Sequence, residues 1–137
     1  AGPQAMDRIR KLRAFAGAPL PLPLQKVAEA VWADEAHVTA SRAIYQQKFA
    51  DADAVFAGMQ GYHPPDGGFF LWLPVDDGVE AALKLWRETG VRVLPGAYLS
   101  RDVGGDNPGQ GYIRVALVAE RQETQRGLIQ LRGCLYD

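Results

Sequence analysis

The sequence predicts an α/β fold in which a short sheet is packed against helices. Three short apolar segments, 69–73, 91–94 and 112–118, have the length and composition of strands. Segments with helical spacing of apolar residues lie between and around them, and glycine and proline mark the junctions. From residue 37 the predicted order is helix, strand, helix, strand, strand, helix, which is typical of a small α/β sandwich.

The first 36 residues are predicted to form a separate helical part. Residues 4–15 and 24–32 have apolar residues at helical spacing. The proline segment 19–23 between them is excluded from a helix interior, because proline lacks the N–H group and restricts the residue before it. Its apolar spacers favour a packed connector over a proline-rich recognition peptide. Asp34-Glu35 predicts a bend or the start of a new helix.

A long helix is predicted from about Val38 to Gly58, followed by a turn at 63–68. The strand at 69–73 is apolar at successive positions, so we expect both of its faces to be covered. Asp77 and Glu80 form a capping-box pattern that starts the next helix, and Gly90 ends it. The inner face of that helix is predicted to consist of Val79, Ala82, Leu83 and Trp86.

The connection from Pro95 to Gly111 has no apolar periodicity. Loops of this length inside compact domains are uncommon and are often functional. A strand follows at 112–118, and a final helix is predicted over 120–135.

Composition excludes several classes of protein. The 137 residues carry a net charge of −1, and their basic residues are scattered, which argues against nucleic-acid binding. No apolar run reaches membrane-spanning length, so no membrane partner is expected. The single cysteine, Cys134, excludes an internal disulfide and a cysteine-based metal site, and a reducing cytoplasm is the expected location. The first residues, Ala1-Gly2-Pro3, suggest a piece of a longer protein.

Few residues in the chain have the pattern of catalytic machinery. There is no Gly-x-Ser-x-Gly or Walker motif, and His37 and His63 fit a helix start and a turn. A Schiff-base lysine needs a desolvated or electropositive site. The four lysines are all predicted to lie among polar neighbours on helices: Lys11, Lys26, Lys48 and Lys84. We therefore expect no catalytic, cofactor-binding or metal-binding residue within this chain.

Arg114 is the exception, because it lies inside a strand that is otherwise apolar. A buried guanidinium requires an anion nearby. Alternation places Arg114 on the same face as Tyr112, Ala116 and Val118, and its planar fork matches a carboxylate with two parallel hydrogen bonds. Two partners remain open from the residues alone: an internal acid on the long helix or in the 95–111 connection, or a bound ligand.

Three motifs in order resemble the C-terminal part of class I aminotransferases, pyridoxal-phosphate enzymes of the aspartate aminotransferase fold. They are Gly67-Gly68-Phe69-Phe70-Leu71-Trp72, Gly90-Val91-x-Val93-Leu94-Pro95-Gly96 and Ile113-Arg114-Val115-Ala116-Leu117. The resemblance covers nearly the whole chain. It implies that residues 1–36 are the end of the large domain and linker helix, and that residues 37–137 are the small domain of this fold type I family.

A finer resemblance involves the 95–111 connection. Its residues 93–99 and Asn107-Pro108-Gly109 are similar to those of succinyldiaminopimelate transaminases. By the family resemblance Arg114 corresponds to the arginine that holds the substrate α-carboxylate. Tyr98 would lie near the mouth of the active site, and Arg101 would meet a distal carboxylate of a dicarboxylic substrate.

The resemblance also implies what this chain lacks. In the family the lysine that binds pyridoxal phosphate lies in a Ser-Lys segment upstream of the matching region, as do the residues that hold the cofactor phosphate and ring. The complete protein is therefore expected to be a cytoplasmic homodimer that transfers an amino group between an amino acid and a 2-oxo acid. The chain alone is expected to bind no cofactor and to be inactive. The alternative is a non-catalytic α/β module that binds an anionic ligand or a partner chain.

Overall fold

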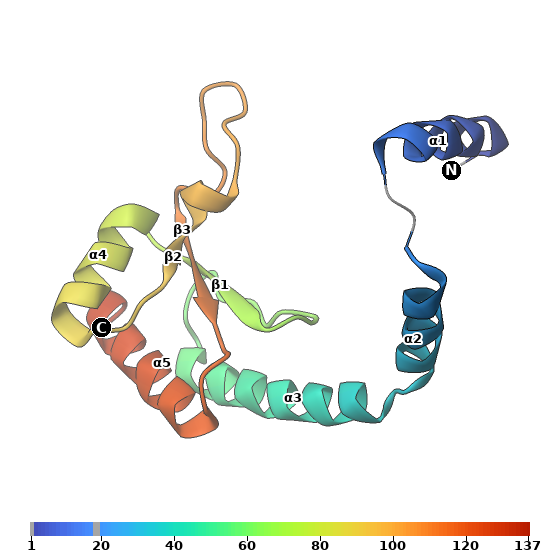
Figure 1. The fold of residues 1–137 in the computed structure, drawn as a ribbon. Helices are drawn as coiled ribbons and strands as arrows, with labels where there is room; N and C mark the ends of the chain where they lie inside the picture. Colours follow the sequence, from blue (N-terminus) through green and yellow to red (C-terminus); the bar gives the residue numbers. More distant parts are fainter. Residues whose placement is uncertain (1, 18–19) are drawn as a thin grey trace. The chain divides into compact units, whose positions relative to one another are not determined.

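The computed structural model describes residues 2–17 and 20–137, and the chain divides into two compact units at the Thr39–Ala40 bond. The first unit contains helices α1 (Pro3–Ala16) and α2 (Leu22–Ala33). Helix α3 (Ala36–Phe56) begins in the first unit and continues into the second (Figure 1). Ala1, Ala18 and Pro19 lie outside the described residues, so the expectations about the chain start and the proline connector are only partly addressed.

The helices of the first unit have exposed apolar side chains. Neither α1 nor α2 contains a buried residue, and Phe15 and Trp32 are 87% and 82% exposed. Helix α2 starts two residues earlier than predicted, because Pro23 is tolerated in the first turn of a helix. The predicted bend at Asp34 is confirmed, since its carboxylate accepts the Ala36 N–H at 3.0 Å.

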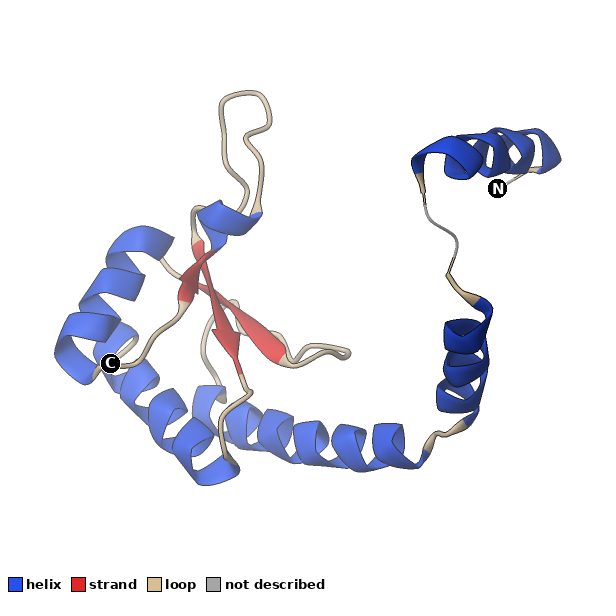
Figure 2. Cartoon of the chain, in the orientation of Figure 1, coloured by secondary structure: helices blue, strands red, loops and turns tan. Residues whose placement is uncertain are grey.

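The second unit confirms the predicted α/β class and the predicted order of elements. A three-stranded antiparallel sheet has the order β1-β3-β2, where β1 is Phe70–Pro74, β2 is Leu94–Pro95 and β3 is Tyr112–Ala116. Helices α4 (Gly78–Thr89) and α5 (Arg121–Leu135) complete the unit (Figure 2). Strand β3, which carries Arg114, is therefore the central strand.

The core lies on one face of the sheet only. Its buried apolar residues come from β1, from β3 and the residue after it, and from α3, α4 and α5: Ala52, Phe56, Leu71, Leu73, Leu85, Ile113, Val115, Leu117, Leu128 and Leu131. The expectation that β1 is covered on both faces is wrong within this chain. Phe70 and Trp72 are 36% and 38% exposed, because the helices of the second unit all contribute to the face that carries Leu71 and Leu73.

Helix α4 has the predicted caps but a different buried face. Asp77 accepts the N–H groups of Glu80 and Val79 at 3.0 and 2.9 Å, which lowers the pKa of its carboxyl, and Gly90 adopts φ +76° at the other end. The predicted inner face is wrong, since Leu85 is buried whereas Trp86 is 52% exposed. The rotation of the helix is set by its start: a Cβ on Gly78 would clash with the Tyr112 carbonyl oxygen.

The segment after α4 also differs from the prediction of a strand at 91–94. Strand β2 is only Leu94–Pro95. The Val91 N–H donates to the Thr89 hydroxyl at 3.1 Å, so the start of this segment is bonded to the end of α4 instead of to the sheet. The 95–111 connection contains the short 3₁₀ helix η1 (Gly96–Leu99) and a tight turn closed by reciprocal backbone hydrogen bonds between Val103 and Asp106. The final helix is confirmed as α5.

Candidate functional site

Arg114 lies at the centre of the open face of the sheet. It pairs with Trp72 of β1 on one side and with Leu94 of β2 on the other. The alternation of β3 is as predicted: Ile113, Val115 and Leu117 face the core, and Arg114 lies on the opposite face with Phe70 and Trp72. Arg114 is half-buried rather than buried, because this face carries no covering layer within the second unit.

The neighbours of the guanidinium are aromatic rings. Its central carbon lies 5.3 Å from the centroid of the Phe70 ring, within the range of a cation–π contact. Beside it the Trp72 and Tyr112 rings are stacked, with centroids 5.5 Å apart and planes 21° apart. A cation–π contact leaves the N–H edge of the guanidinium fork available, so the fork retains its capacity for a carboxylate.

No carboxylate within residues 2–17 and 20–137 forms an ion pair with Arg114. Of the acids on α3, Asp51 receives the bidentate pair from Arg121 at 2.7 and 2.8 Å, and this hydrogen bonding lowers the pKa of Asp51. Asp53 accepts the hydroxyl of Tyr62. Two of the candidates for an internal partner on that helix are therefore engaged elsewhere, and the ligand interpretation of Arg114 is favoured.

Tyr98 lies in a different setting. It is on η1, is 68% exposed, and lines an apolar groove of about 520 Å³ between α4 and the β2 segment. The other lining residues are Val79, Ala82, Leu83, Trp86, Arg92, Val93 and Pro95. Neither Arg114 nor Arg101 lines this groove. Its walls include the half-open face of α4 that the sequence analysis assigned to the core.

Arg101 is an exposed residue that follows η1 in the 95–111 connection. No hydrogen bond or ion pair joins it to another residue in the described part of the chain. The structure therefore does not bring the three predicted site residues into one cavity. Arg114 is on the sheet, and Tyr98 and Arg101 are on the connection that leads into the same strand.

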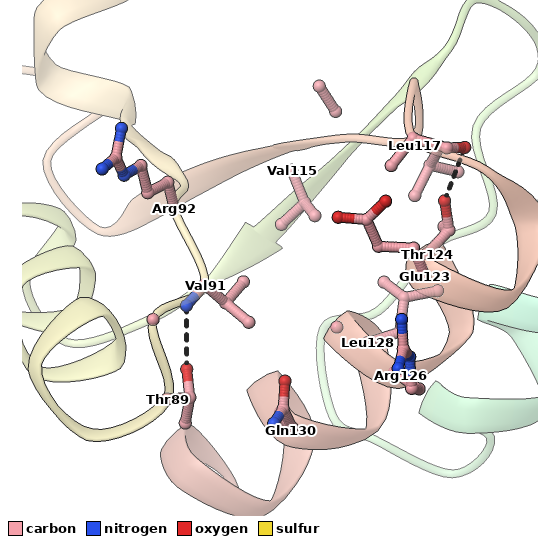
Figure 3. Close-up of a pocket in the computed structure, with 14 residues that line it drawn as sticks. Thr89, Val91, Arg92, Val115, Leu117, Glu123, Thr124, Arg126, Leu128 and Gln130 are labelled. Atoms are coloured by element: carbon pink, nitrogen blue, oxygen red, sulfur yellow. Dashed lines mark hydrogen bonds between the residues drawn. The ribbon is translucent and has the colours of Figure 1, made fainter.

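A second cavity, of about 490 Å³, opens on the core side of β3 (Figure 3). Val115 and Leu117 line it together with Leu128 of α5, so it lies on the face opposite to Arg114. It forms where residues 91–93 separate from β3, because β2 pairs with β3 only at Leu94 and Pro95. Glu123 and Arg126 lie at this cavity, but no ion pair joins them in the described structure.

The described residues form no cluster of three histidine, cysteine, aspartate or glutamate side chains suited to a metal ion. Cys134 is half-buried, and its pKa is raised by burial and by the nearby Glu88 carboxylate, which lies 3.4 Å from the sulfur. Both features oppose thiolate formation. Among the helices of residues 2–17 and 20–137, none is both long and apolar enough to span a bilayer.

Three structurally important side chains were missed by the sequence analysis. Lys48 was assigned to a polar helix face but is buried, with its ammonium bonded to the carbonyl oxygens of Leu117 and Ala119 at 2.8 and 2.6 Å. The contact of Phe70 with Arg114 was not predicted, and neither were the hydrogen bonds of Asn107 within the 95–111 connection. The i, i+4 spacing of Lys48 from Ala52 on the core stripe of α3 was an available signal for its burial.

The chain is similar to curated proteins and solved structures that are named as aminotransferases. The chain is 29% identical over 119 residues to a 4-dedimethylamino-4-oxo-anhydrotetracycline transaminase of Streptomyces rimosus, a match that covers 85% of this chain and 31% of the relative. An aminotransferase structure from Neisseria meningitidis matches 96% of the chain and 34% of its own length, with a TM-score of 0.86 and 31% identity. A probable N-succinyldiaminopimelate aminotransferase from Thermus thermophilus matches 96% of the chain and 35% of its own length, with a TM-score of 0.74 and 25% identity.

Homologues and structural neighbours of the chain are therefore aminotransferases of the aspartate aminotransferase fold, as the motifs indicated. No protein-family model matches the sequence. The chain spans about a third of the length of the relatives and structures it matches.

The residues of this chain do not fit the pyridoxal phosphate that the family uses. Three of the four lysines bind protein oxygens: Lys48 binds two backbone carbonyls, Lys84 binds the Cys134 carbonyl at 2.7 Å, and Lys26 pairs with Glu29 at 2.8 Å. Lys11 lies exposed on α1. Lys48 is buried, but its ammonium is held by the two carbonyl oxygens, and the other three lysines are exposed. None therefore offers the free, desolvated amine that a Schiff-base lysine needs. What the chain offers is the half-buried guanidinium of Arg114, which has no carboxylate partner among the described residues.

Proposed function

We propose that this chain is part of a pyridoxal-phosphate-dependent aminotransferase in which Arg114 binds the α-carboxylate of the substrates. In the complete protein, a homodimer, an amino group passes between an amino acid and a 2-oxo acid. Residues 1–36 are the end of the large domain, and residues 37–137 are the small domain. The observation that carries the proposal is a half-buried guanidinium without a carboxylate partner in the described structure, in a chain of which 96% matches a solved aminotransferase structure.

Both substrates of this reaction carry the same anionic handle. An amino acid and a 2-oxo acid each have an α-carboxylate, and the N–H groups of Arg114 donate two parallel hydrogen bonds to its oxygens. This contact fixes the direction of the adjacent Cα, which is an orientation effect on the rate. The cofactor chemistry belongs to residues outside this chain, so the chain alone is inactive.

Within this activity we propose a dicarboxylic substrate of the succinyldiaminopimelate type. The solved structure of that probable function matches nearly the whole chain. Arg101 is exposed and without a protein partner among the described residues, which suits a second carboxylate, and Tyr98 lies on the adjoining η1 helix. The relative from Streptomyces rimosus, by its name, acts on a different kind of substrate. Kinetics of an Arg101 variant with and without a distal carboxylate on the substrate therefore test this proposal.

The test is steady-state kinetics of the complete protein with Arg114 replaced. Arg114→Ala is expected to lower kcat/KM by an amount equivalent to about 2–5 kcal/mol of transition-state stabilisation, the range for removing one partner of a desolvated charge pair. Arg114→Lys should not restore activity, because the two-pronged geometry is lost.

Arg92→Ala is the matched control. Arg92 also lies over an aromatic ring, with its central carbon 5.7 Å from the Trp86 centroid, but on the groove side of β2. We expect its replacement to change kcat/KM by less than about twofold, as for an exposed charge. Turnover near the wild-type value in both Arg114 variants would show that Arg114 is not the carboxylate receptor.

The rival function is a non-catalytic module that binds an anion or a partner chain. The coding sequence upstream of Ala1 separates the two. An in-frame Ser-Lys cofactor segment, and a protein that is yellow with lysine-bound cofactor, support the enzyme. A complete protein that lacks both supports the module.

A further inference from the structure

The 95–111 connection is organised around one side chain, that of Asn107. Its Oδ1 accepts the Ser100 hydroxyl at 2.8 Å and the Gly109 N–H at 3.0 Å. Its Nδ2 donates to the Asp102 carboxylate at 3.0 Å and to the Ala97 carbonyl oxygen at 3.3 Å. A side-chain amide has two donor hydrogens and two acceptor sites, so every one of them is used.

Three of these bonds, to Ala97, Ser100 and Asp102, join the two limbs of the connection. Ala97 lies in η1 and Ser100 follows it on the first limb, whereas Asn107 and Gly109 belong to the second limb, which leads into β3. The limbs also approach closely: a Cβ on Gly109 would clash with Gly96, and the Ser100 hydroxyl lies 2.9 Å from the Gly96 carbonyl oxygen. Together these contacts form a compact loop base, defined here as residues 95–100 and 107–111.

The loop base determines the direction of Arg101. Ser100 has extended backbone angles, φ −119° and ψ 163°, and Val103 is in a β-bridge. Ser100 and Asp102 both direct their side chains to Asn107. Arg101 lies between these two residues, is exposed, and unlike them makes no side-chain hydrogen bond to the loop base in the described structure.

We infer that Asn107 is a positioning residue for Arg101: by closing the loop base it holds the Arg101 guanidinium ready for the distal acid group of a substrate. This inference rests on the proposed function and extends it to the control of substrate choice. The advantage is entropic, because a preformed connection loses little further freedom when the substrate binds. Asn107 itself touches no reacting atom.

The first experiment measures the loop base without enzyme activity. Arg101 is the only basic residue in the 95–111 connection, so trypsin has one cleavage site there. In the complete protein we expect Asn107→Ala and Asn107→Asp to speed cleavage after Arg101 by about tenfold, which corresponds to the loss of one to two net hydrogen bonds. Asn107→Asp has the same shape but replaces the donor beside Asp102 with an acceptor, so it separates hydrogen bonding from packing.

The control for proteolysis is Asp106→Ala. The Asp106 side chain makes no hydrogen bond or ion pair in the described structure, although its backbone pairs with Val103 in the same turn. Its cleavage rate should equal that of the wild type. Equal rates for Asn107→Asp and the wild type would overturn the inference.

The second experiment uses the complete protein with two amino donors of equal length, L-glutamate and L-norvaline, of which only the first has a distal carboxylate. Asn107→Ala should raise KM for glutamate by about tenfold while kcat and the norvaline constants change by less than about twofold. In an Arg101→Ala background the same substitution should have no further effect on the ratio of the two donors, because residues that act through one another are not additive.

The outcomes separate the two proposals. An equal loss with both donors, or an additive double variant, overturns the positioning role of Asn107. If Arg101→Ala leaves the ratio of the glutamate and norvaline constants unchanged, Arg101 does not bind a distal carboxylate, and this inference is overturned as well. A wild-type complete protein without transaminase activity overturns the proposed function, whereas the proteolysis result still tests the loop base.

Discussion

The buried lysine offers the sharpest test of the forces that hold β3 in place. Lys48 of α3 is 5% exposed, and its ammonium donates to the carbonyl oxygens of Leu117 and Ala119, directly after the strand that carries Arg114. We consider Lys48→Met, which keeps the unbranched stem and removes the charge. No large cavity is created, so the result reports the polar contacts.

The structure permits an estimate of the size of the effect. Ala119 keeps a second donor, the Thr124 hydroxyl at 3.0 Å, whereas Lys48 is the sole donor that the described structure gives to the Leu117 carbonyl. One buried carbonyl without a donor costs about 1–3 kcal/mol. Removal of a buried charge returns part of its desolvation energy. A net loss of about 2 kcal/mol in the free energy of unfolding follows.

The assay is urea unfolding of the chain, followed by tryptophan fluorescence in a Trp32→Phe background. The remaining Trp72 and Trp86 both lie in the second unit. With a slope of about 2 kcal/mol per molar urea, the midpoint should fall by about 1 M.

Lys84→Met is the matched control for this experiment. Its ammonium also donates to a backbone carbonyl, that of Cys134 at 2.7 Å, but the bond is exposed and water replaces it. The control should shift the midpoint by less than about 0.3 M, as for an exposed charge. If Lys48→Met behaves like the control, the two buried bonds add nothing. If it stabilises the chain, desolvation of the ammonium outweighs them.

Two further predictions concern close packing and exposed apolar surface. Gly96→Ala places a methyl group against the Gly109 carbonyl and 2.9 Å from the Tyr112 carbonyl, so it should lower the free energy of unfolding by about 1–3 kcal/mol. Gly133→Ala, in open space on α5, should raise the free energy of unfolding by about 0.5–1 kcal/mol. Thermal unfolding measures both variants, and equal effects would contradict the predicted clash. The apolar faces of α1 and α2 should make the isolated chain self-associate, and Trp32→Ser should weaken this in sedimentation velocity; a wild-type chain that stays monomeric at all concentrations would refute it.

The elements that local chemistry specifies were predicted well. The capping pattern Asp77-x-x-Glu80 and Gly90 set the ends of α4, because each depends on hydrogen bonds and backbone angles within a few residues. The alternation of β3 correctly separated its core residues from Arg114, because successive side chains in a strand point to opposite faces. The order of elements and the α/β class followed from such local signals.

The contacts that form the candidate site join residues far apart in the sequence. The sequence alone did not predict these contacts. The apolar side chains of Phe70, Trp72 and Trp86 suggested burial, but hydrophobicity does not say which neighbour covers a side chain. Among the described residues, no neighbour covers any of the three fully.

By itself, the sequence determined where helices and strands form and that one arginine lies in an apolar strand, since these depend on spacing along the chain. Only the tertiary structure decided that Arg114 lies on an open aromatic face where no described acid pairs with it, that Lys48 is buried, and that Asn107 closes the loop base. The physical reason is that a hydrogen bond or ion pair depends on distances of about 3 Å between groups far apart in sequence, and the fold alone sets such distances.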